Sequence, residues 1–399
     1  MEKKRALEDL TVLDLTRVVA GPYCTSILGD MGAKVIKIEI PGRGDDARAY
    51  DPHINGESVY YANLNRNKLG VTLNLKAQKG KEIFLELVRK ADIVVENYRP
   101  GVMDKLGIGY DVLKEVNDQI IYAAVSGFGS YGPYSQRPGY DIISQAMGGL
   151  MSVTGEEGSS PTRSGNAMGD ILGGMNLTIG ILAAVNARRL IGHGQRVDVS
   201  LVDSVVASLE NAFERYHYSG DIPKRMGNAY ASIAPYDSYR AKDGYVIIAC
   251  GNQKLYEKFC NEVIHMPEMI TDERFATIPL RVKNNKIQKQ YIESWTAKYT
   301  VDEVVDLILA KGIPAGPIYD VKQIVEDKHI AKARQMFLDI DHPVIGKMKV
   351  NGNPIKLMDT MPDVQIPAPT LGQYNDFVYG EMLRMSKQEI EDLSKNGVI

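Results

Sequence analysis

Cysteine, charge of one sign and long apolar runs are all scarce in this 399-residue sequence. Only three cysteines occur, Cys24, Cys250 and Cys260, so we expect neither a disulfide framework nor a zinc cluster, and a reducing cytoplasm fits best. Lys and Arg number 47 against 50 Asp and Glu, which argues against nucleic acid or an anionic membrane as the main partner. Residues 1–10 lack the apolar core of a signal peptide, and the apolar stretch 179–185 is far shorter than the ~18 residues that span a bilayer.

Two common kinds of catalytic site are also missing. The six histidines are scattered without the spacing of metal ligands, so we expect no metal site. No G-x-S-x-G sequence is present, which leaves a Ser-His-Asp hydrolase without its nucleophile.

The residues that are present describe a globular α/β protein. Hydrophobic residues make up 44% and charged residues 24%, the balance of an ordinary folded domain. Short apolar runs alternate with segments of helical periodicity, which predicts a parallel sheet covered on both faces. We expect strands at 11–15, 34–40, 93–96, 120–126 and 197–201, and helices at 23–31, 76–90, 171–189 and 202–218.

The length is enough for two to three domains at ~150 residues each. We expect a large domain that begins with residues 1–220, a smaller α+β domain at 225–325, and a return to the large domain at 330–399. The Pro- and Gly-containing segment 221–234 predicts the linker, and strands near 336–340 and 348–350 indicate the return. A capping box, Ser386 with Glu389, predicts a last short helix.

In such a sheet ligands bind outside the carboxyl ends of the strands, which directs attention to residues 17–20, 97–101 and 126–132. Residues 127–132 (GFGSYG) match G-x-G-x-x-G, but Pro133 follows and no helix is expected there, so we interpret them as a substrate-lining loop rather than a dinucleotide site. Asp170 precedes the long helix at 171–189. The residues alone favour a helix N-cap for Asp170, although a helix N-terminus would also keep a nucleophilic carboxylate ionised.

Together these stretches resemble family III of the CoA-transferases. The resemblance covers nearly the whole chain and is carried, in order, by residues 13–22 (LDLTRVVAGP), 32–39 (GAKVIKIE), 96–101 (ENYRPG), 137–141 (RPGYD), Gly169 with Asp170, 312–317 (GIPAGP), 371–373 (LGQ) and 397–399 (GVI). The family implies a Rossmann-like large domain built from both ends of the chain, a small inserted domain, and a homodimer of two chains interlocked as rings.

The resemblance also implies a reaction. The family's nucleophile is the Asp that corresponds to Asp170, which forms an acyl anhydride and then an aspartyl-CoA thioester while CoA moves from an acyl-CoA donor to a carboxylic acid. CoA thioesters are then substrates, and no permanently bound cofactor is expected. The positions that correspond to CoA contacts are Val18, Leu73, Lys76, Asn97, Arg99, Lys105, Arg137 and Tyr140.

Two departures from the formyl-CoA transferases bear on the acid. Ile40 occupies the position of an Arg, and residues 227–232 (GNAYAS) replace a glycine-rich loop. We therefore expect a medium-sized, branched, aromatic or 2-hydroxy acid rather than oxalate or formate. Two alternatives remain: a racemase resembling α-methylacyl-CoA racemase, which would need a His where this chain has Tyr140, and a non-catalytic acyl-CoA-binding protein. A tyrosine of ordinary pKa near ~10 is a poor base at neutral pH, which favours the transferase.

Overall fold

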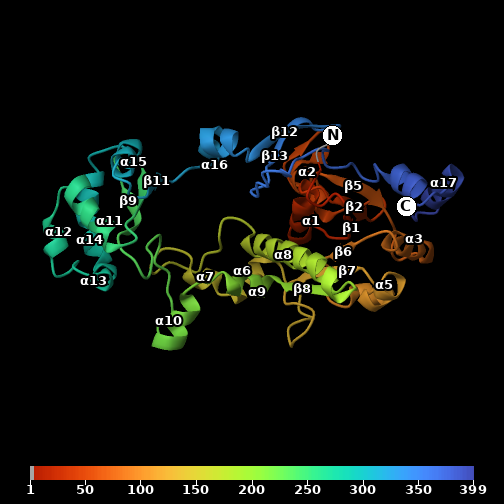
Figure 1. The fold of residues 1–399 in the computed structure, drawn as a ribbon, viewed down its shortest axis with the longest axis horizontal. Coiled ribbons are helices and arrows are strands. Elements are labelled where there is room, and N and C mark those ends of the chain that lie inside the picture. The colour runs from red at the N-terminus through yellow and green to blue at the C-terminus, as the bar shows by residue number, and fades with distance from the viewer. Residues whose placement is uncertain (1–3) are drawn as a thin grey trace. The chain divides into compact units, whose positions relative to one another are not determined.

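The computed structural model describes residues 4–399, which form two compact units (Figure 1). The large unit comprises the chain up to Leu150, then Arg163–Phe213 and Lys328–Ile399. The small unit comprises Met151–Thr162 and Glu214–Asp327. The large unit therefore takes its residues from three separate stretches of the chain, and residues 151–162, expected in the large domain, belong to the small unit.

Six parallel strands form the centre of the large unit, in the order β5-β2-β1-β6-β7-β8. Strands β2 and β5 follow β1 on one side, and β7 and β8 follow β6 on the other. The strand order therefore reverses between β1 and β6. This parallel sheet confirms the predicted α/β class. The strands are β1 (Thr11–Asp14), β2 (Lys34–Glu39), β5 (Lys68–Thr72), β6 (Ile93–Glu96), β7 (Ile121–Ser126) and β8 (Arg196–Ser200).

Helices cover both faces of this sheet, because successive strand residues point to opposite faces. Val12 packs with α1 (Ala20–Asp30) and α8 (Met168–Ile191), whereas Leu13 packs with α3 (Gln78–Val88) and α5 (Tyr110–Val116). The C-terminal elements η4 (Asp376–Met382) and α17 (Lys387–Lys395) join the α3 face, where Val398 and Ile399 are also buried. The predicted capping box of α17 is confirmed.

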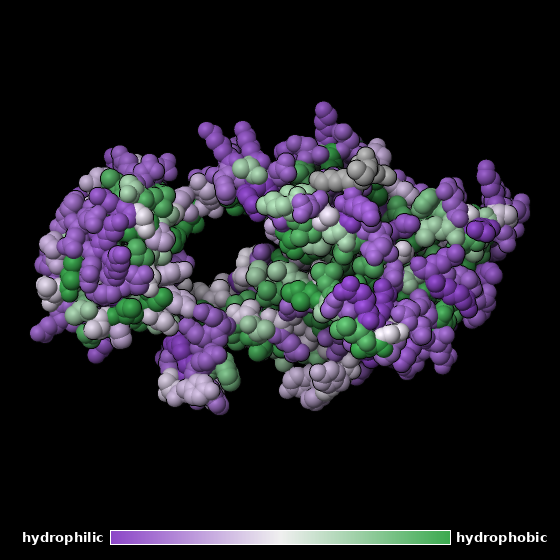
Figure 2. Space-filling model, viewed as in Figure 1, coloured by the Kyte–Doolittle hydropathy of each residue, from purple (hydrophilic) through white to green (hydrophobic). Residues whose placement is uncertain are grey.

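By length and composition alone, α8 passes as a helix able to cross a membrane. No long uninterrupted apolar run marks this helix in the sequence, since glycines and polar residues divide it. In this fold Leu177 and Ile181 are buried against the sheet, so one face of α8 is an ordinary core face. Another face exposes Met175 and Ile179. Figure 2 shows hydrophobic residues at the surface over the region of α8.

Several elements differ from the prediction. The single helix expected at 202–218 is wrong, since the chain forms two helices separated at 208–211. The C-terminal strands expected near 336–340 and 348–350 are present, and they pair with each other. The remaining elements of the large unit are η1 (Asp46–Ala49), β3 (His53–Ile54), β4 (Glu57–Ser58), α2 (Val59–Leu64), α4 (Val102–Lys105), α6 (Asp141–Met147), α9 (Leu201–Ala207), η3 (Lys328–Ala333), β12 (Phe337–His342) and β13 (Gly346–Asn351). Two helices, α7 (Leu150–Val153) and α10 (Ala212–Ser219), begin in the large unit and end in the small one.

The small unit has an antiparallel sheet of its own, in the order β11-β10-β9. Its core gathers Tyr239, Tyr256, Phe259 and Trp295. The elements are β9 (Tyr236–Arg240), β10 (Tyr245–Ala249), α11 (Gln253–Lys258), η2 (Phe259–Val263), α12 (Glu268–Thr271), α13 (Ile278–Lys283), α14 (Asn285–Thr296), α15 (Val301–Leu309), β11 (Ala315–Pro317) and α16 (Val321–Glu326).

Candidate active site

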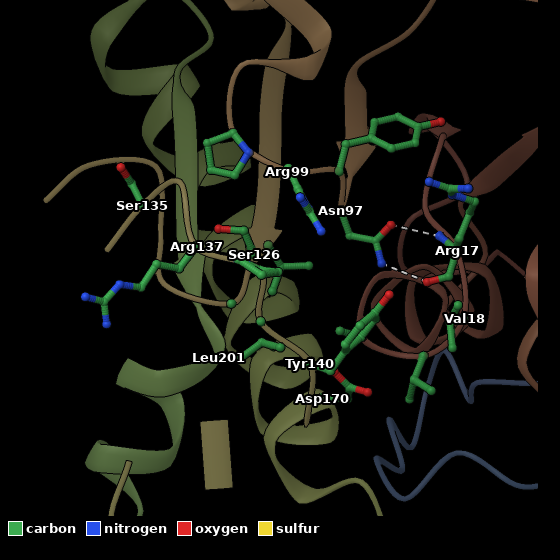
Figure 3. Close-up of a pocket in the computed structure, with 18 of the residues that line it drawn as sticks. Arg17, Val18, Asn97, Arg99, Ser126, Ser135, Arg137, Tyr140, Asp170 and Leu201 are labelled. Carbon is green, nitrogen blue, oxygen red and sulfur yellow. Dashed lines mark hydrogen bonds between the residues drawn. The ribbon is translucent and has the colours of Figure 1, made fainter. Parts of the chain in front are cut away.

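The reversal of strand order between β1 and β6 predicts a crevice at the carboxyl ends of these strands. Two hydrogen bonds tie the loops that follow them. The Arg17 amide donates to Asn97 Oδ1 at 2.8 Å, and Asn97 Nδ2 donates to the Arg17 carbonyl at 2.7 Å (Figure 3). The loops after β1 and β6 are thereby held in one position relative to each other.

Val18 stands in the left-handed region of backbone space, at a φ of +68°. A β-branched residue rarely adopts this conformation, so the surrounding structure has to stabilise it. Asp45 Oδ1 accepts the Val18 amide at 3.0 Å, and Lys37 Nζ lies 2.8 Å from Asp45 Oδ2. The same Lys37 ammonium donates to the Thr16 carbonyl.

This charge pair is fully buried, and its members compensate each other. Burial alone would raise the pKa of Asp45, but the adjacent Lys37 and the hydrogen bonds lower that pKa below its usual value. Burial alone would lower the pKa of Lys37, but Asp45 and Asp14 raise it. Both groups therefore stay charged and hold the turn at Val18 in place.

A cavity of about 230 Å³ opens beside this turn. We call it the Asp170 cavity. In Figure 3 Tyr140 and Asp170 lie at one side of it, while the guanidinium of Arg137 points away from Asp170. Arg137 instead stacks on Tyr134, with its guanidinium carbon 3.7 Å from the ring centre. The lining residues are Arg17, Val18, Val19, Ala20, Asp46, Asn97, Tyr98, Arg99, Pro100, Val125, Ser126, Gly127, Ser135, Arg137, Pro138, Gly139, Tyr140, Asp170 and Leu201.

A second cavity, of about 720 Å³, shares Arg17, Tyr98 and Arg99 with the first, so the two adjoin. We call it the Lys76 cavity. Its wall combines apolar side chains with four cationic ones. The lining residues are Arg17, Ile38, Glu39, Ile40, Pro41, Arg43, Leu73, Asn74, Leu75, Lys76, Tyr98, Arg99, Val102, Leu106 and Gly397.

Asp170 lies in the first turn of α8 and is not the N-cap. The N-cap residue is Ala167, so the cap expected from the sequence is wrong for Asp170. Asp170 is largely buried, and its pKa is raised to about 7 by burial and by the nearby negative charge of Asp141. Burial and Asp141 therefore both oppose the ionisation that the helix N-terminus favours, and Asp170 titrates near neutral pH.

The structure brings most of the predicted positions to the two cavities. Val18, Asn97, Arg137 and Tyr140 line the Asp170 cavity, Leu73 and Lys76 line the Lys76 cavity, and Arg99 lines both. Lys105 lines neither cavity. It is the last residue of the short helix α4, and its side chain is exposed to solvent. Gly127 lines the Asp170 cavity, and no helix begins in 127–132, as expected for a substrate-lining loop.

Three residues near Asp170 escaped the sequence analysis. Tyr50 and Tyr60 pack edge to face, with ring centres 5.6 Å apart. Burial is the main cause that raises the pKa of both hydroxyls, and nearby negative charges, including that of Asp170, raise it further. Asp141 hydrogen-bonds the start of α8. The two tyrosines do not follow a strand of the central sheet: Tyr50 follows η1 and Tyr60 lies in α2, so the search at strand ends did not reach them. The pattern RPGYD does contain Asp141, and that was the only available signal.

A comparison with known proteins decides the family. CoA-transferase family III matches residues 7–375. The chain belongs to this family. This CoA-transferase is 41% identical to acetyl-CoA:oxalate CoA-transferase of Acetobacter aceti, over 89% of the chain and 90% of the relative. It is 36% identical to succinyl-CoA:glutarate CoA-transferase of Homo sapiens, over 100% of the chain and 91% of the relative. The predicted enzyme class is confirmed.

The fold agrees with solved structures. The crystal structure of a CAIB/BAIF family protein from Brucella suis superimposes with a TM-score of 0.83 at 37% identity, covering 95% of the CoA-transferase and 100% of that chain. The architecture of the CoA-transferase is therefore that of its family.

Proposed function

We propose that this CoA-transferase moves CoA from an acyl-CoA to a carboxylic acid through covalent intermediates on Asp170. The observation that carries the proposal is the state of Asp170, a largely buried carboxylate in a cavity at the reversal of strand order. Within residues 4–399 its side chain accepts no hydrogen bond from another residue. A carboxylate without donors is a stronger nucleophile than one that is solvated or paired.

The chemistry needs no further reagent. Asp170 attacks the thioester carbonyl, the C–S bond breaks, and an aspartyl–acyl anhydride and a CoA thiolate form. The thiolate attacks the aspartyl carbonyl, releases the first carboxylate and leaves an aspartyl-CoA thioester. The incoming carboxylate attacks that carbonyl and expels the thiolate, which then attacks the new acyl carbonyl and restores Asp170. Because an anhydride hydrolyses readily, the cavity has to exclude water during these steps.

The two cavities fit the two ends of an acyl-CoA. Arg17, Arg43, Lys76 and Arg99 supply positive charge for the phosphates, and Leu73, Leu75 and Leu106 supply an apolar surface for the adenine. Since Arg17 and Arg99 line both cavities, the pantetheine arm passes between them and brings the thioester to Asp170. We also expect a cytoplasmic homodimer, with the apolar surface of α8 at the interface.

For the acid, we propose a dicarboxylate of about four to six carbons. The sequence favours a medium-sized, branched, aromatic or 2-hydroxy acid. Relatives that are 34% to 38% identical carry the names succinyl-CoA:mesaconate and succinyl-CoA--D-citramalate CoA-transferase. Both acids are branched dicarboxylates, and citramalate is also a 2-hydroxy acid, so these names support the proposal, whereas the relative at 41% identity is named for oxalate.

Mass spectrometry tests the covalent step. Protein incubated with acyl-CoA and digested should yield the Asp170 peptide as a thioester, which hydroxylamine converts to a hydroxamate. Asp170→Ala should lose both this adduct and CoA exchange while keeping its circular dichroism spectrum. Exchange by the alanine variant at even a tenth of the wild-type rate contradicts the proposal.

An acceptor panel tests the acid. With succinyl-CoA as donor, kcat/KM for glutarate, mesaconate and citramalate should exceed that for butyrate and isocaproate by about tenfold or more, because a site built to pair with a second carboxylate rejects an acid that lacks it. A preference for phenyllactate would favour an aromatic acid instead, and a preference for oxalate or formate would contradict the expected size.

A further inference from the structure

Helix α8 has no side-chain cap of its own, because its N-cap residue is Ala167. The cap comes from another helix. Asp141 Oδ1, on the first turn of α6, accepts the Gly169 amide at 2.8 Å and the Asp170 amide at 3.4 Å. Its other oxygen, Oδ2, accepts Gln145 Nε2 at 2.8 Å, which fixes the carboxylate in place.

The approach of Asp141 depends on the absence of a side chain at Gly169. A Cβ at this position would lie 2.1 Å from Ser144 Oγ and 3.2 Å from Asp141 Oδ1. The Asp141 side chain is 13% exposed. The close approach of α6 to the start of α8 therefore requires a glycine at position 169.

The arrangement has a consequence for Asp170. A first-turn Asp ordinarily gains hydrogen bonds from the free amides of its helix, and these bonds lower its basicity. Here two of these amides are already occupied by Asp141, and the Met168 amide donates to the Asn166 carbonyl. The Asp170 carboxylate is left without these donors and beside a second negative charge.

We propose that Asp141 is a positioning residue that keeps Asp170 basic and nucleophilic by occupying the amides of α8 and by placing a like charge beside it. This inference rests on the proposed role of Asp170 as the nucleophile. Acylation converts Asp170 to a neutral group, so the repulsion between the two carboxylates is relieved as the anhydride forms.

Other charged and titratable groups line the cavity or interact with Asp170 or Asp141, and all of them are retained when only Asp141 is changed. Arg163 lies nearest to Asp141, with Nη1 3.9 Å from Oδ2, and it partly offsets the charge there. The others are Tyr140 next to α6, Asp46, Tyr50 and Tyr60 from the segment around η1 and α2, and Arg17, Arg99 and Arg137 on the cavity wall.

The test is the pH dependence of kcat/KM in Asp141→Asn, which keeps an oxygen acceptor for the amides and removes the charge. The acid limb of the profile should move to lower pH by about one unit. The plateau at high pH should fall, since a less basic carboxylate is a weaker nucleophile. Asp141→Glu keeps the negative charge, so its acid limb should lie at the wild-type position.

Asp198→Asn is a matched control. The Asp198 carboxylate also accepts a backbone amide of a neighbouring segment, that of Ser130 at 3.1 Å, but Asp198 does not line the Asp170 cavity. This variant should leave the acid limb unchanged even if its thermal unfolding temperature falls.

An acid limb in Asp141→Asn identical to wild type would overturn the inference and leave Asp141 as a structural cap only. If Asp141→Asn does not fold, a downward shift in the folded Asp141→Glu variant would overturn it equally. The proposed function fails separately, through exchange by Asp170→Ala.

Discussion

Two clusters of buried charged residues lie near the Asp170 cavity, and they differ in whether the neighbouring charges have opposite or like sign. Behind Val18, Asp45 is paired with Lys37, and Asp14 with Lys68 at 3.0 Å. On α8, Asp170 has the like-charged Asp141 as its neighbour. The first cluster joins opposite charges and the second brings like charges together.

The difference separates a supporting region from a reactive one. Burial opposes the charge of Asp14, yet Lys68, Lys37 and two hydroxyl donors lower its pKa well below the usual value. Burial also opposes the charge of Asp170, but there Asp141 adds to the effect and the pKa rises to about 7. The compensated cluster holds the backbone, and the uncompensated carboxylate is free to react.

Breaking the compensated cluster should have the largest effect on stability. Lys37→Met leaves the buried Asp45 carboxylate without its counter-charge and the Thr16 carbonyl without its donor. We expect the free energy of unfolding to fall by about 3–5 kcal/mol, measured by urea denaturation.

The control for this variant uses an exposed ion pair in the loop that follows β2. Arg43 pairs with Asp46 at 2.5 Å, but its side chain is 69% exposed. Arg43→Met should change the free energy of unfolding by less than about 0.5 kcal/mol. An equal loss of unfolding free energy in Lys37→Met and Arg43→Met would mean that the buried pair contributes no more to stability than the exposed pair.

Removing the buried, unpaired charge of Asp170 should stabilise the folded protein. The pKa of Asp170 is about 7 in the folded chain and 3.8 by reference, so the folded state binds the proton more tightly and loses stability as pH rises from about 4 to 7. Asp170→Asn removes this cost. We expect it to raise the free energy of unfolding by about 2 kcal/mol at pH 8, roughly half of the full linkage value because Asp170 retains some exposure.

At pH 4 the same variant should match the wild type, since Asp170 is then protonated in the folded protein. Thermal or urea unfolding at the two pH values provides the measurement. A stabilisation of equal size at both would assign the effect to packing rather than to charge.

The smallest effect is expected where neutral hydrogen bonds join the two loops. Asn97→Ala removes both bonds to the Arg17 backbone, and we expect a loss of about 1 kcal/mol together with a higher KM for the acyl-CoA. Asn97→Asp keeps an acceptor for the Arg17 amide and should retain part of the affinity. An unchanged KM in Asn97→Ala would mean that the junction does not position the substrate.

Much of the sheet was predictable because apolar runs such as Ile93–Glu96 are buried on both faces. β5 was missed because its sequence does not resemble a strand of that kind. It begins with the buried Lys68, whose partner Asp14 lies on another strand, and it contains Gly70. A Cβ at Gly70 would lie 2.5 Å from Pro369 Cγ, so this glycine is required by a segment nearly 300 positions away.

The position of the candidate nucleophile was predictable from the sequence, but its surroundings were not. Asp170 could be singled out from its position before a long apolar helix, and the family resemblance assigned it a role. Its electrostatic environment could not be predicted, because this depends on α6 packing against α8 and placing Asp141 within reach of the Asp170 amide. The conformation of Val18 escaped for the same reason, since Asp45 and Lys37 come from a different loop and strand.

The three-part construction of the large unit also bears on how the chain folds during synthesis. The last strand of the central sheet ends at Ser200, but the residues that cover one face of that sheet include Val378, Tyr379 and Ile399. That face, with Leu13, Ile36 and Val71, stays partly uncovered until the small unit and the C-terminal segment have been made. A nascent chain of this kind exposes an apolar sheet for the time needed to synthesise nearly half its length, which makes it a natural client for chaperones.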